Sequence, residues 1–157
     1  MFNSLFDGAP VDIMQMLDAR ERRAHTQQQL LEQFNPCVLV SITLNIPGPV
    51  KNSEAITTVF ASVISELDEA LQSFEKLQQE DFSLPTGMEF YRVLRADALS
   101  VKRACTEFEE GHSLGRLLDI DVVEMAGDTP TPISRTALGM TPRRCFICNA
   151  DAKVCAR

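Results

Sequence analysis

The chain has 157 residues, of which 45% are hydrophobic and 24% charged, with a formal net charge of -7. These proportions are ordinary for a globular protein and exclude disordered and fibrous classes. The negative charge argues against nucleic acids and anionic membranes as partners, because both require a surplus of Lys and Arg. The sequence has neither an apolar run of membrane-spanning length nor a recognisable signal peptide. We therefore expect one cytoplasmic domain over residues 1–157.

The first half of the chain predicts two helices and one strand. A largely polar helix is expected to start at Pro10 and to end before the Asn-Pro pair at 35–36. Residues 37–46 are rich in β-branched and apolar types and predict a buried strand. Ser53 is then expected to cap the most regular helix, whose apolar positions from Ile56 to Phe74 follow the i, i+3, i+4, i+7 pattern.

The second half continues the alternation. Residues 88–96 predict a second strand, and Asp97 caps a helix that ends at Gly111. Residues 117–124 predict a third strand, and residues 133–144 a short strand with irregular coil. The order predicts an α/β (α+β) fold in which a compact mixed sheet is backed by helices as one pair of layers.

Two aspartates interrupt the apolar run of the third strand. Alternate residues of a strand point to the same face, so Asp119 and Asp121 are expected to project together while Leu118, Ile120 and Val122 face the core. A divalent cation would turn the repulsion between the two carboxylates into attraction, and Mg²⁺ suits such a pair when substrate phosphates complete its coordination. The alternative is that both aspartates are charges on a solvent-facing edge that prevents aggregation.

Candidate phosphate-binding residues precede the third predicted strand and the helix capped by Ser53. Gly115 permits close backbone approach and Arg116 offers a planar fork to a phosphate, while His112 is a candidate base or phosphate donor. In "NIPGPVKNS", Lys51 stands just before a helix N-terminus, where anions are favoured. The alternative for His112 is a surface histidine at a helix end. The alternative for the Lys51 segment is a proline-stiffened connection in which Ser53 is an ordinary helix cap.

Three of the five cysteines cluster in a C-terminal segment at about 141–157, as Cys145, Cys148 and Cys155. The C-x2-C spacing suits half of a tetrahedral zinc site, whereas a closed structural site needs four ligands. A reduced, buried turn is the alternative, because no further Cys or His follows. A fourth ligand would have to come from elsewhere in the chain: Cys37, Cys105, His25 or His112.

Four segments of the sequence carry a resemblance to a known family. Taken together and in this order, "MLDARERRAHTQQQLL", "LNIPGPVKNS", "RADALSVKRACTEFEEGHSLGRLLDIDVV" and "ISRTALGMTPRRCFICNADAKVCAR" resemble the apo-citrate lyase phosphoribosyl-dephospho-CoA transferase family. The resemblance implies an enzyme that attaches 2'-(5''-triphosphoribosyl)-3'-dephospho-CoA to a serine of the acyl carrier subunit of citrate lyase. Pyrophosphate is released and the prosthetic group becomes linked through a phosphodiester. A nucleotidyltransferase-like fold is the matching expectation.

This reaction assigns hypothetical roles to the residues singled out above, since attack on an α-phosphate uses a divalent cation and cationic phosphate contacts. Asp119 and Asp121 would be the catalytic pair that holds Mg²⁺. Asp97 or Glu124 would be a third carboxylate acting on the serine proton. The phosphate-binding group would be Arg116, Lys51 and Gly115, with Arg135 joining them.

The surface on which the carrier docks is expected to be basic, with Lys102 and Arg103 or Arg143 and Arg144 as candidates, although solvated charge explains these pairs equally well. Two alternative functions remain open. One is a zinc-stabilised module that binds citrate lyase subunits without chemistry. The other is a related transferase that acts on a different acyl carrier protein.

Overall fold

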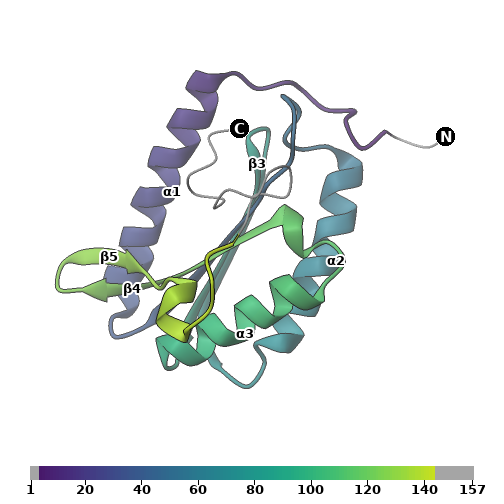
Figure 1. The fold of residues 1–157 in the computed structure, drawn as a ribbon. Coiled ribbons are helices and arrows are strands. Elements are labelled where there is room, and N and C mark those ends of the chain that lie inside the picture. Colours follow the sequence, from purple (N-terminus) through teal and green to yellow (C-terminus); the bar gives the residue numbers. More distant parts are fainter. Residues whose placement is uncertain (1–3, 144–157) are drawn as a thin grey trace.

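The computed structural model describes residues 4–143, which fold into a five-stranded sheet flanked by three α-helices (Figure 1). The predicted α+β class is confirmed, and every strand pairing in this part of the chain is antiparallel. None of its helices is long and apolar enough to cross a membrane. The elements in chain order are α1 (Ile13–Phe34), β1 (Val38–Leu44), α2 (Glu54–Ala70), β2 (Glu75–Leu84), β3 (Gly87–Arg95), α3 (Ala98–Gly111), a 3-10 turn (Gly115–Leu117), β4 (Leu118–Ala126), β5 (Thr129–Pro132) and a second 3-10 turn (Arg135–Leu138).

Local sequence signals set the helix boundaries. Helix α1 begins after Asp12, not at Pro10, because Asp12 and Gln15 form a reciprocal capping box. The Ser53 side chain accepts a hydrogen bond from the backbone N–H of Ile56 at 3.1 Å, which confirms it as the cap of α2. Helix α2 ends at Ala70, so the apolar pattern that continues to Phe74 runs beyond the helix itself.

The strands lie in the order β2-β3-β1-β4-β5, with helices on both faces (Figure 1). Helices α2 and α3 cover one face and α1 crosses the other. The prediction of a single pair of layers was therefore wrong. The third layer was missed because α1 is largely polar and its buried residues are few: Ala19, Leu30 and Leu31.

Two strands of the sheet were not predicted. Strand β2 is an edge strand whose residues are exposed or half-buried on both faces, so it lacks the alternation that marks a half-buried strand. Strand β5, with the sequence TPTP, contains two prolines, which the sequence reading treated as a turn. Prolines are tolerated there because β5 is the other edge of the sheet.

The face toward α2 and α3 carries the larger core. Alternate residues of β1, β3 and β4 pack there against apolar side chains of both helices, among them Val40, Ile120 and Phe60. Arg92 is a charged residue of this face and is 2% exposed. Its guanidinium is paired with Asp68 of α2 and Asp81 of β2, which satisfies the buried charge.

The face toward α1 has a smaller core, confined to one end of the helix. Leu30 and Leu31 pack there on Leu39, Tyr91 and a few further apolar residues of the sheet. Toward the start of α1 the same sheet face becomes polar and charged. This change of character along one face positions the candidate site.

Candidate functional site

The aspartate pair lies where the sequence placed it. Leu118, Ile120 and Val122 of β4 are at most 2% exposed and pack toward α2 and α3. Asp119 and Asp121 project to the opposite face, beside α1, and both are exposed. The prediction that the strand has one apolar and one doubly anionic face is confirmed.

Two of the predicted cations lie at the end of the sheet nearest the pair. Arg116 is exposed in the 3-10 turn that leads directly into β4. The backbone N–H of Asn45 donates to the carbonyl of Leu117 at 2.7 Å, which brings the 45–53 loop beside this turn. Within that loop, the Lys51 ammonium donates to the carbonyl of Ile46 at 2.6 Å. The structure therefore brings Arg116 and the loop of Lys51 to the end of the sheet at which Asp119 lies.

Gly115 has a different role from the predicted one. A Cβ atom at this position would lie 1.7 Å from the carbonyl oxygen of Glu109, so the glycine lets the turn pack closely on α3. Gly115 is also buried. The close approach inferred from the sequence is real, and its partner is the backbone of α3.

A carboxylate that the sequence analysis did not single out lies on the same sheet face. Glu89 of β3 is 2% exposed and accepts two hydrogen bonds from Arg22 of α1, at 2.8 and 3.0 Å. Arg23 donates to the same carboxylate at 3.5 Å, and the Tyr91 hydroxyl donates at 3.0 Å. The hydrogen bonds to Glu89 raise the pKa of Arg22, while burial and the nearby Glu89 charge raise that of Tyr91.

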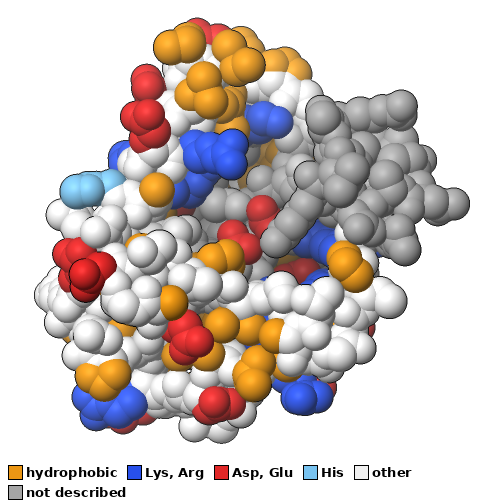
Figure 2. Space-filling view, turned by 60° about the vertical axis from the view of Figure 1, so that its left-hand side comes forward, with side chains coloured by type: hydrophobic (Ala, Val, Ile, Leu, Met, Phe, Trp, Pro, Cys, Tyr) orange, Lys and Arg blue, Asp and Glu red, His pale blue; other side chains and the backbone are white. Residues whose placement is uncertain are grey.

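The strand register gives the position of Glu89 relative to the aspartate pair. Thr43 of β1 stands opposite Glu89 on one side and opposite Asp119 on the other. Ser41 of β1 likewise stands opposite Asp121, and the Gln27 side chain of α1 donates to its hydroxyl at 3.0 Å. Figure 2 shows acidic side chains in a hollow of the α1 side, with Lys and Arg side chains above it.

Arg135 and His112 are engaged away from the pair. Arg135 donates to the carboxylates of Glu109 and Glu110 on α3, at 2.7 and 2.9 Å. His112 contacts Glu66 of α2 through one ring nitrogen and accepts from a backbone N–H through the other. Both belong to the α2 and α3 side, and His112 matches the alternative of a histidine at a helix end.

Neither predicted third carboxylate joins the aspartates. Asp97 accepts from the backbone N–H and the hydroxyl of Ser100, as the cap of α3, and these hydrogen bonds lower its pKa. Glu124 lies in β4 an odd number of residues after Asp119, so it shares the face of Val122 and not that of the aspartates. Of the carboxylates considered, Glu89 is the one that shares the sheet face of the pair.

The basic residues expected at the docking surface differ in how exposed their side chains are. Lys102 is 7% exposed, so its expected role as a surface cation is wrong, whereas Arg103 is exposed. Arg143 donates to the carbonyls of Arg116 and Leu118, both at 2.7 Å, and pairs with Glu109. Arg144 lies outside the described residues.

The predicted zinc ligands Cys145, Cys148 and Cys155 also lie outside the described residues. Cys105 is fully buried in the larger core, and burial raises the pKa of its thiol to about 12, so it is a poor candidate for the fourth ligand. Burial also raises the pKa of Cys37. Within residues 4–143 no three Cys, His, Asp or Glu side chains are grouped closely enough to hold a metal.

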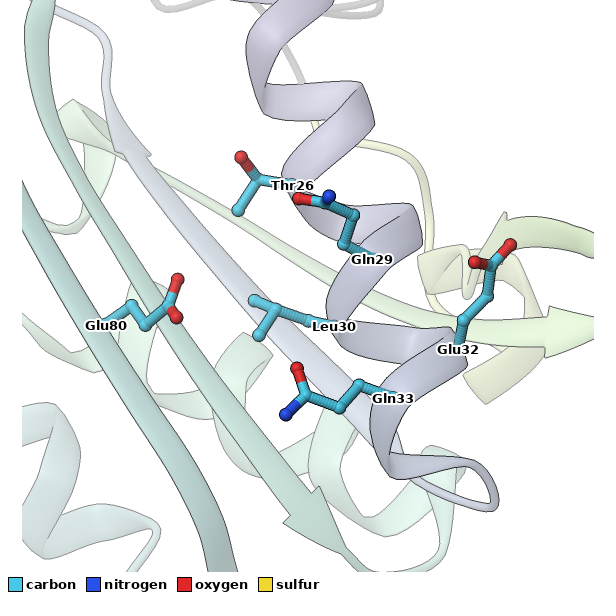
Figure 3. A pocket seen from close by; sticks show the side chains of 6 residues that line it. All are labelled: Thr26, Gln29, Leu30, Glu32, Gln33 and Glu80. Carbon is cyan, nitrogen blue, oxygen red and sulfur yellow. The ribbon is translucent and has the colours of Figure 1, made fainter.

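A groove of about 510 Å³ lies between α1 and β2 (Figure 3). Its lining is mainly polar, with Thr26, Gln29 and Gln33 of α1 facing Glu80 across the gap. Since β2 and β4 lie on opposite sides of β1 and β3, this groove is separate from the aspartate pair. It contains none of the predicted site residues.

Comparison with known proteins gives a consistent result over nearly the whole chain. The sequence profile of the family described as apo-citrate lyase phosphoribosyl-dephospho-CoA transferase matches residues 11–157. A Streptococcus pyogenes serotype M18 protein, named probable apo-citrate lyase phosphoribosyl-dephospho-CoA transferase, is 38% identical over 99% of this chain and 81% of its own length. The transferase of that name from Escherichia coli O7:K1 is 36% identical over 94% of this chain and 79% of its own length.

A third relative is a longer protein. Protein CitXG of Leuconostoc mesenteroides subsp. cremoris is 37% identical over 96% of this chain, which corresponds to 32% of the relative. The family profile covers more than nine-tenths of the present chain, and the two transferases, matched over 81% and 79% of their own length, exceed 30% identity. The chain belongs to the apo-citrate lyase phosphoribosyl-dephospho-CoA transferase family.

Proposed function

We propose that this protein transfers 2'-(5''-triphosphoribosyl)-3'-dephospho-CoA to a serine of the acyl carrier subunit of apo-citrate lyase and releases pyrophosphate. Family membership supplies the reaction class. The observation that carries the assignment to a site is the exposed pair of Asp119 and Asp121 on a sheet face that two arginines of α1 also contact through Glu89. The reaction is of the nucleotidyltransferase type and is expected to take place in the cytoplasm.

The aspartate pair is suited to Mg²⁺. This ion commonly takes one or two protein carboxylates and completes its octahedron with water and substrate phosphates. Two exposed carboxylates on one strand are the number of protein ligands that such a site uses. When bound, Mg²⁺ would neutralise phosphate charge as it develops in the transition state.

At phosphorus the transfer forms one bond and breaks one, and the serine hydroxyl also gives up its proton. The carrier serine oxygen attacks the α-phosphorus, a new P–O bond forms, and the bond to pyrophosphate breaks. We assign the serine proton to the aspartate pair, because Asp97 caps a helix and Glu124 faces away. Arg116 and Lys51, at the near end of the sheet, are assigned to phosphate contacts.

The alternative of a non-catalytic, zinc-stabilised module makes an opposite prediction. It requires Cys145, Cys148 and Cys155 and tolerates loss of the aspartates. Metal analysis of the purified chain tests the zinc part directly: stoichiometric zinc that disappears in Cys145→Ala would establish a structural site. Transfer to a different acyl carrier is separated from the main proposal by offering both carriers.

The proposed reaction is tested by the mass of the apo acyl carrier subunit after incubation with the protein, Mg²⁺ and triphosphoribosyl-dephospho-CoA. We expect an increase equal to the phosphoribosyl-dephospho-CoA group, and no increase when EDTA is present. The carrier with its acceptor serine changed to alanine is the matched control. An unmodified carrier, with both proteins shown to be folded, would refute the proposal for this acceptor.

A further inference from the structure

We propose that Arg22 and Arg23 of α1, held in place by the buried Glu89, bind the pyrophosphate end of the triphosphate substrate. This inference rests on the proposed function and adds a binding site on α1 to it. The three residues are called the α1 arginine cluster below. The cluster was not predicted from the sequence.

Charge balance is the first argument. Two guanidinium groups share one carboxylate, which leaves an excess positive charge at a place where the sheet is otherwise acidic. The 2.8 and 3.0 Å contacts of Arg22 set the single negative charge of Glu89 against one of the two guanidinium groups. Arg23 makes a single contact with it, at 3.5 Å, so the charge of Glu89 balances one of the two arginines and not both.

Accessibility is the second argument. The Glu89 side chain is 2% exposed, whereas the side chains of Arg22 and Arg23 are 43% and 21% exposed. Each guanidinium has five N–H donors, and Glu89 engages two of them on Arg22 and one on Arg23. The carboxylate therefore lies behind the arginines, and donors remain on their outward side.

Preorganisation is the third argument. An arginine side chain that must be ordered on binding loses rotamer entropy, which weakens the complex. Glu89 orders the arginine side chains already in the folded protein, so this entropy is not lost on binding. The position of Glu89 is itself fixed by a hydrogen bond from the hydroxyl of Tyr91. A buried carboxylate that aims arginines outward is an arrangement suited to phosphate.

Position is the fourth argument. Glu89 and Asp119 stand on either side of Thr43 in one row across the sheet, so their backbones are separated by two strand spacings, about 10 Å. A substrate with its α-phosphate at the aspartates can extend its other two phosphates toward α1. The arginines would then neutralise charge that grows on the departing pyrophosphate.

The same contacts could also serve only to fasten α1 to the sheet, and a direct binding measurement separates the two roles. The probe is inorganic tripolyphosphate with Mg²⁺, titrated calorimetrically into the full chain. The variants are Arg23→Gln, Arg23→Lys and, as a control, Arg95→Gln. Arg95 of β3 forms an exposed ion pair with Glu75 of β2, away from the cluster.

We expect wild type and Arg95→Gln to bind the probe equally, and Arg23→Gln to bind about 10-fold more weakly or worse, from the loss of a charged hydrogen bond. Arg23→Lys should recover part of the affinity, because it keeps the charge without the planar fork. Urea unfolding should show all four proteins equally folded. Equal affinity of Arg23→Gln and wild type, or no binding by wild type, would overturn the site.

Failure of the site and failure of the proposed function give different results. Suppose that wild type modifies no carrier and that Arg23→Gln binds the probe more weakly than wild type does. The arginine site then stands and the proposed transfer fails. If wild type modifies the carrier and Arg23→Gln has an unchanged KM, kcat and probe affinity, the transfer stands and the arginine site fails.

Discussion

The two faces of the sheet are made from the same strands and differ in what they bury. On the α2 and α3 face, apolar side chains form a core along the length of the strands, and the buried charge of Arg92 is fully paired. On the α1 face the apolar contacts are limited to one end, and carboxylates and arginines occupy the other. Strand alternation lets one face carry the stability while the other carries polar groups that would be costly in a core.

The largest effect on stability should come from the α2 and α3 face. Phe60 is 2% exposed in the larger core, so Phe60→Ala should lower the free energy of unfolding by about 3–5 kcal/mol. Val59, its neighbour on α2, is 40% exposed, and Val59→Ala should cost less than about 0.5 kcal/mol. Urea unfolding measures both. A similar cost for the two variants would contradict the assignment of Phe60 to the larger core.

The turn that leads into β4 packs closely on α3 at Gly115. Gly115→Ala places a Cβ atom against the carbonyl of Glu109 and should cost about 1–3 kcal/mol through forced movement of the backbone. Gly111→Ala is the matched control, since open space surrounds that position. Thermal or urea unfolding provides the readout. If Gly115→Ala keeps full stability and only raises the KM of the triphosphate substrate, the glycine serves phosphate after all.

The loop before α2 gives a smaller effect. The Ser53 hydroxyl accepts from the N–H of Ile56 and donates to the carbonyl of Leu5 at 2.7 Å. Ser53→Ala should therefore lower the free energy of unfolding by about 1 kcal/mol, with little change in substrate KM. Ser62, exposed in the middle of α2, supplies the control Ser62→Ala, which should lose no stability. A change in KM without loss of stability would move Ser53 into the site.

The smallest effect concerns pH and the α3 side. Burial raises the pKa of Glu109 despite its pairs with Arg135 and Arg143. The folded state therefore holds this proton more tightly than the unfolded chain, and the stability that Glu109 contributes falls as pH rises through the raised pKa.

Comparison with Glu109→Gln isolates this contribution. The stability of wild type relative to the variant should fall as pH rises above the usual glutamate pKa of about 4.3, because only the wild type ionises there. Urea unfolding at several pH values measures the difference. A relative stability that rises with pH would mean that the two arginines outweigh the cost of burial.

The fold was predictable where burial imposes a period on the sequence. Helix α2 and strand β4 each place one face in the core, so their patterns appear in the residues themselves. Strand β2 was missed because, as an exposed edge, it has no buried face that would select apolar residues at alternate positions. Helix α1 was found but its position was not, since few of its residues are buried.

Within the candidate site, the sequence predicted groups of residues that share one local segment of the chain. Asp119, Asp121 and Arg116 are close together along the chain, and their shared location follows from strand geometry. Glu89 and Arg22 are 67 residues apart, so no spacing rule relates them. The charge of Glu89 within the apolar segment MEFYRVLRA was the available signal. The period of two also places Glu124 on the opposite face of β4 from the aspartates, which excludes it without any structure.

The most direct test of the account compares two substitutions on the same strand, Asp119→Asn on the α1 face and Glu124→Gln on the other. Transfer to the apo acyl carrier would be measured by mass spectrometry under single-turnover conditions, with folding checked by urea unfolding. We expect Asp119→Asn to lose about 100-fold or more in rate and Glu124→Gln to match wild type, with both proteins equally stable. Full activity in Asp119→Asn, or equal losses in the two variants, would contradict the assignment of the chemistry to the α1 face.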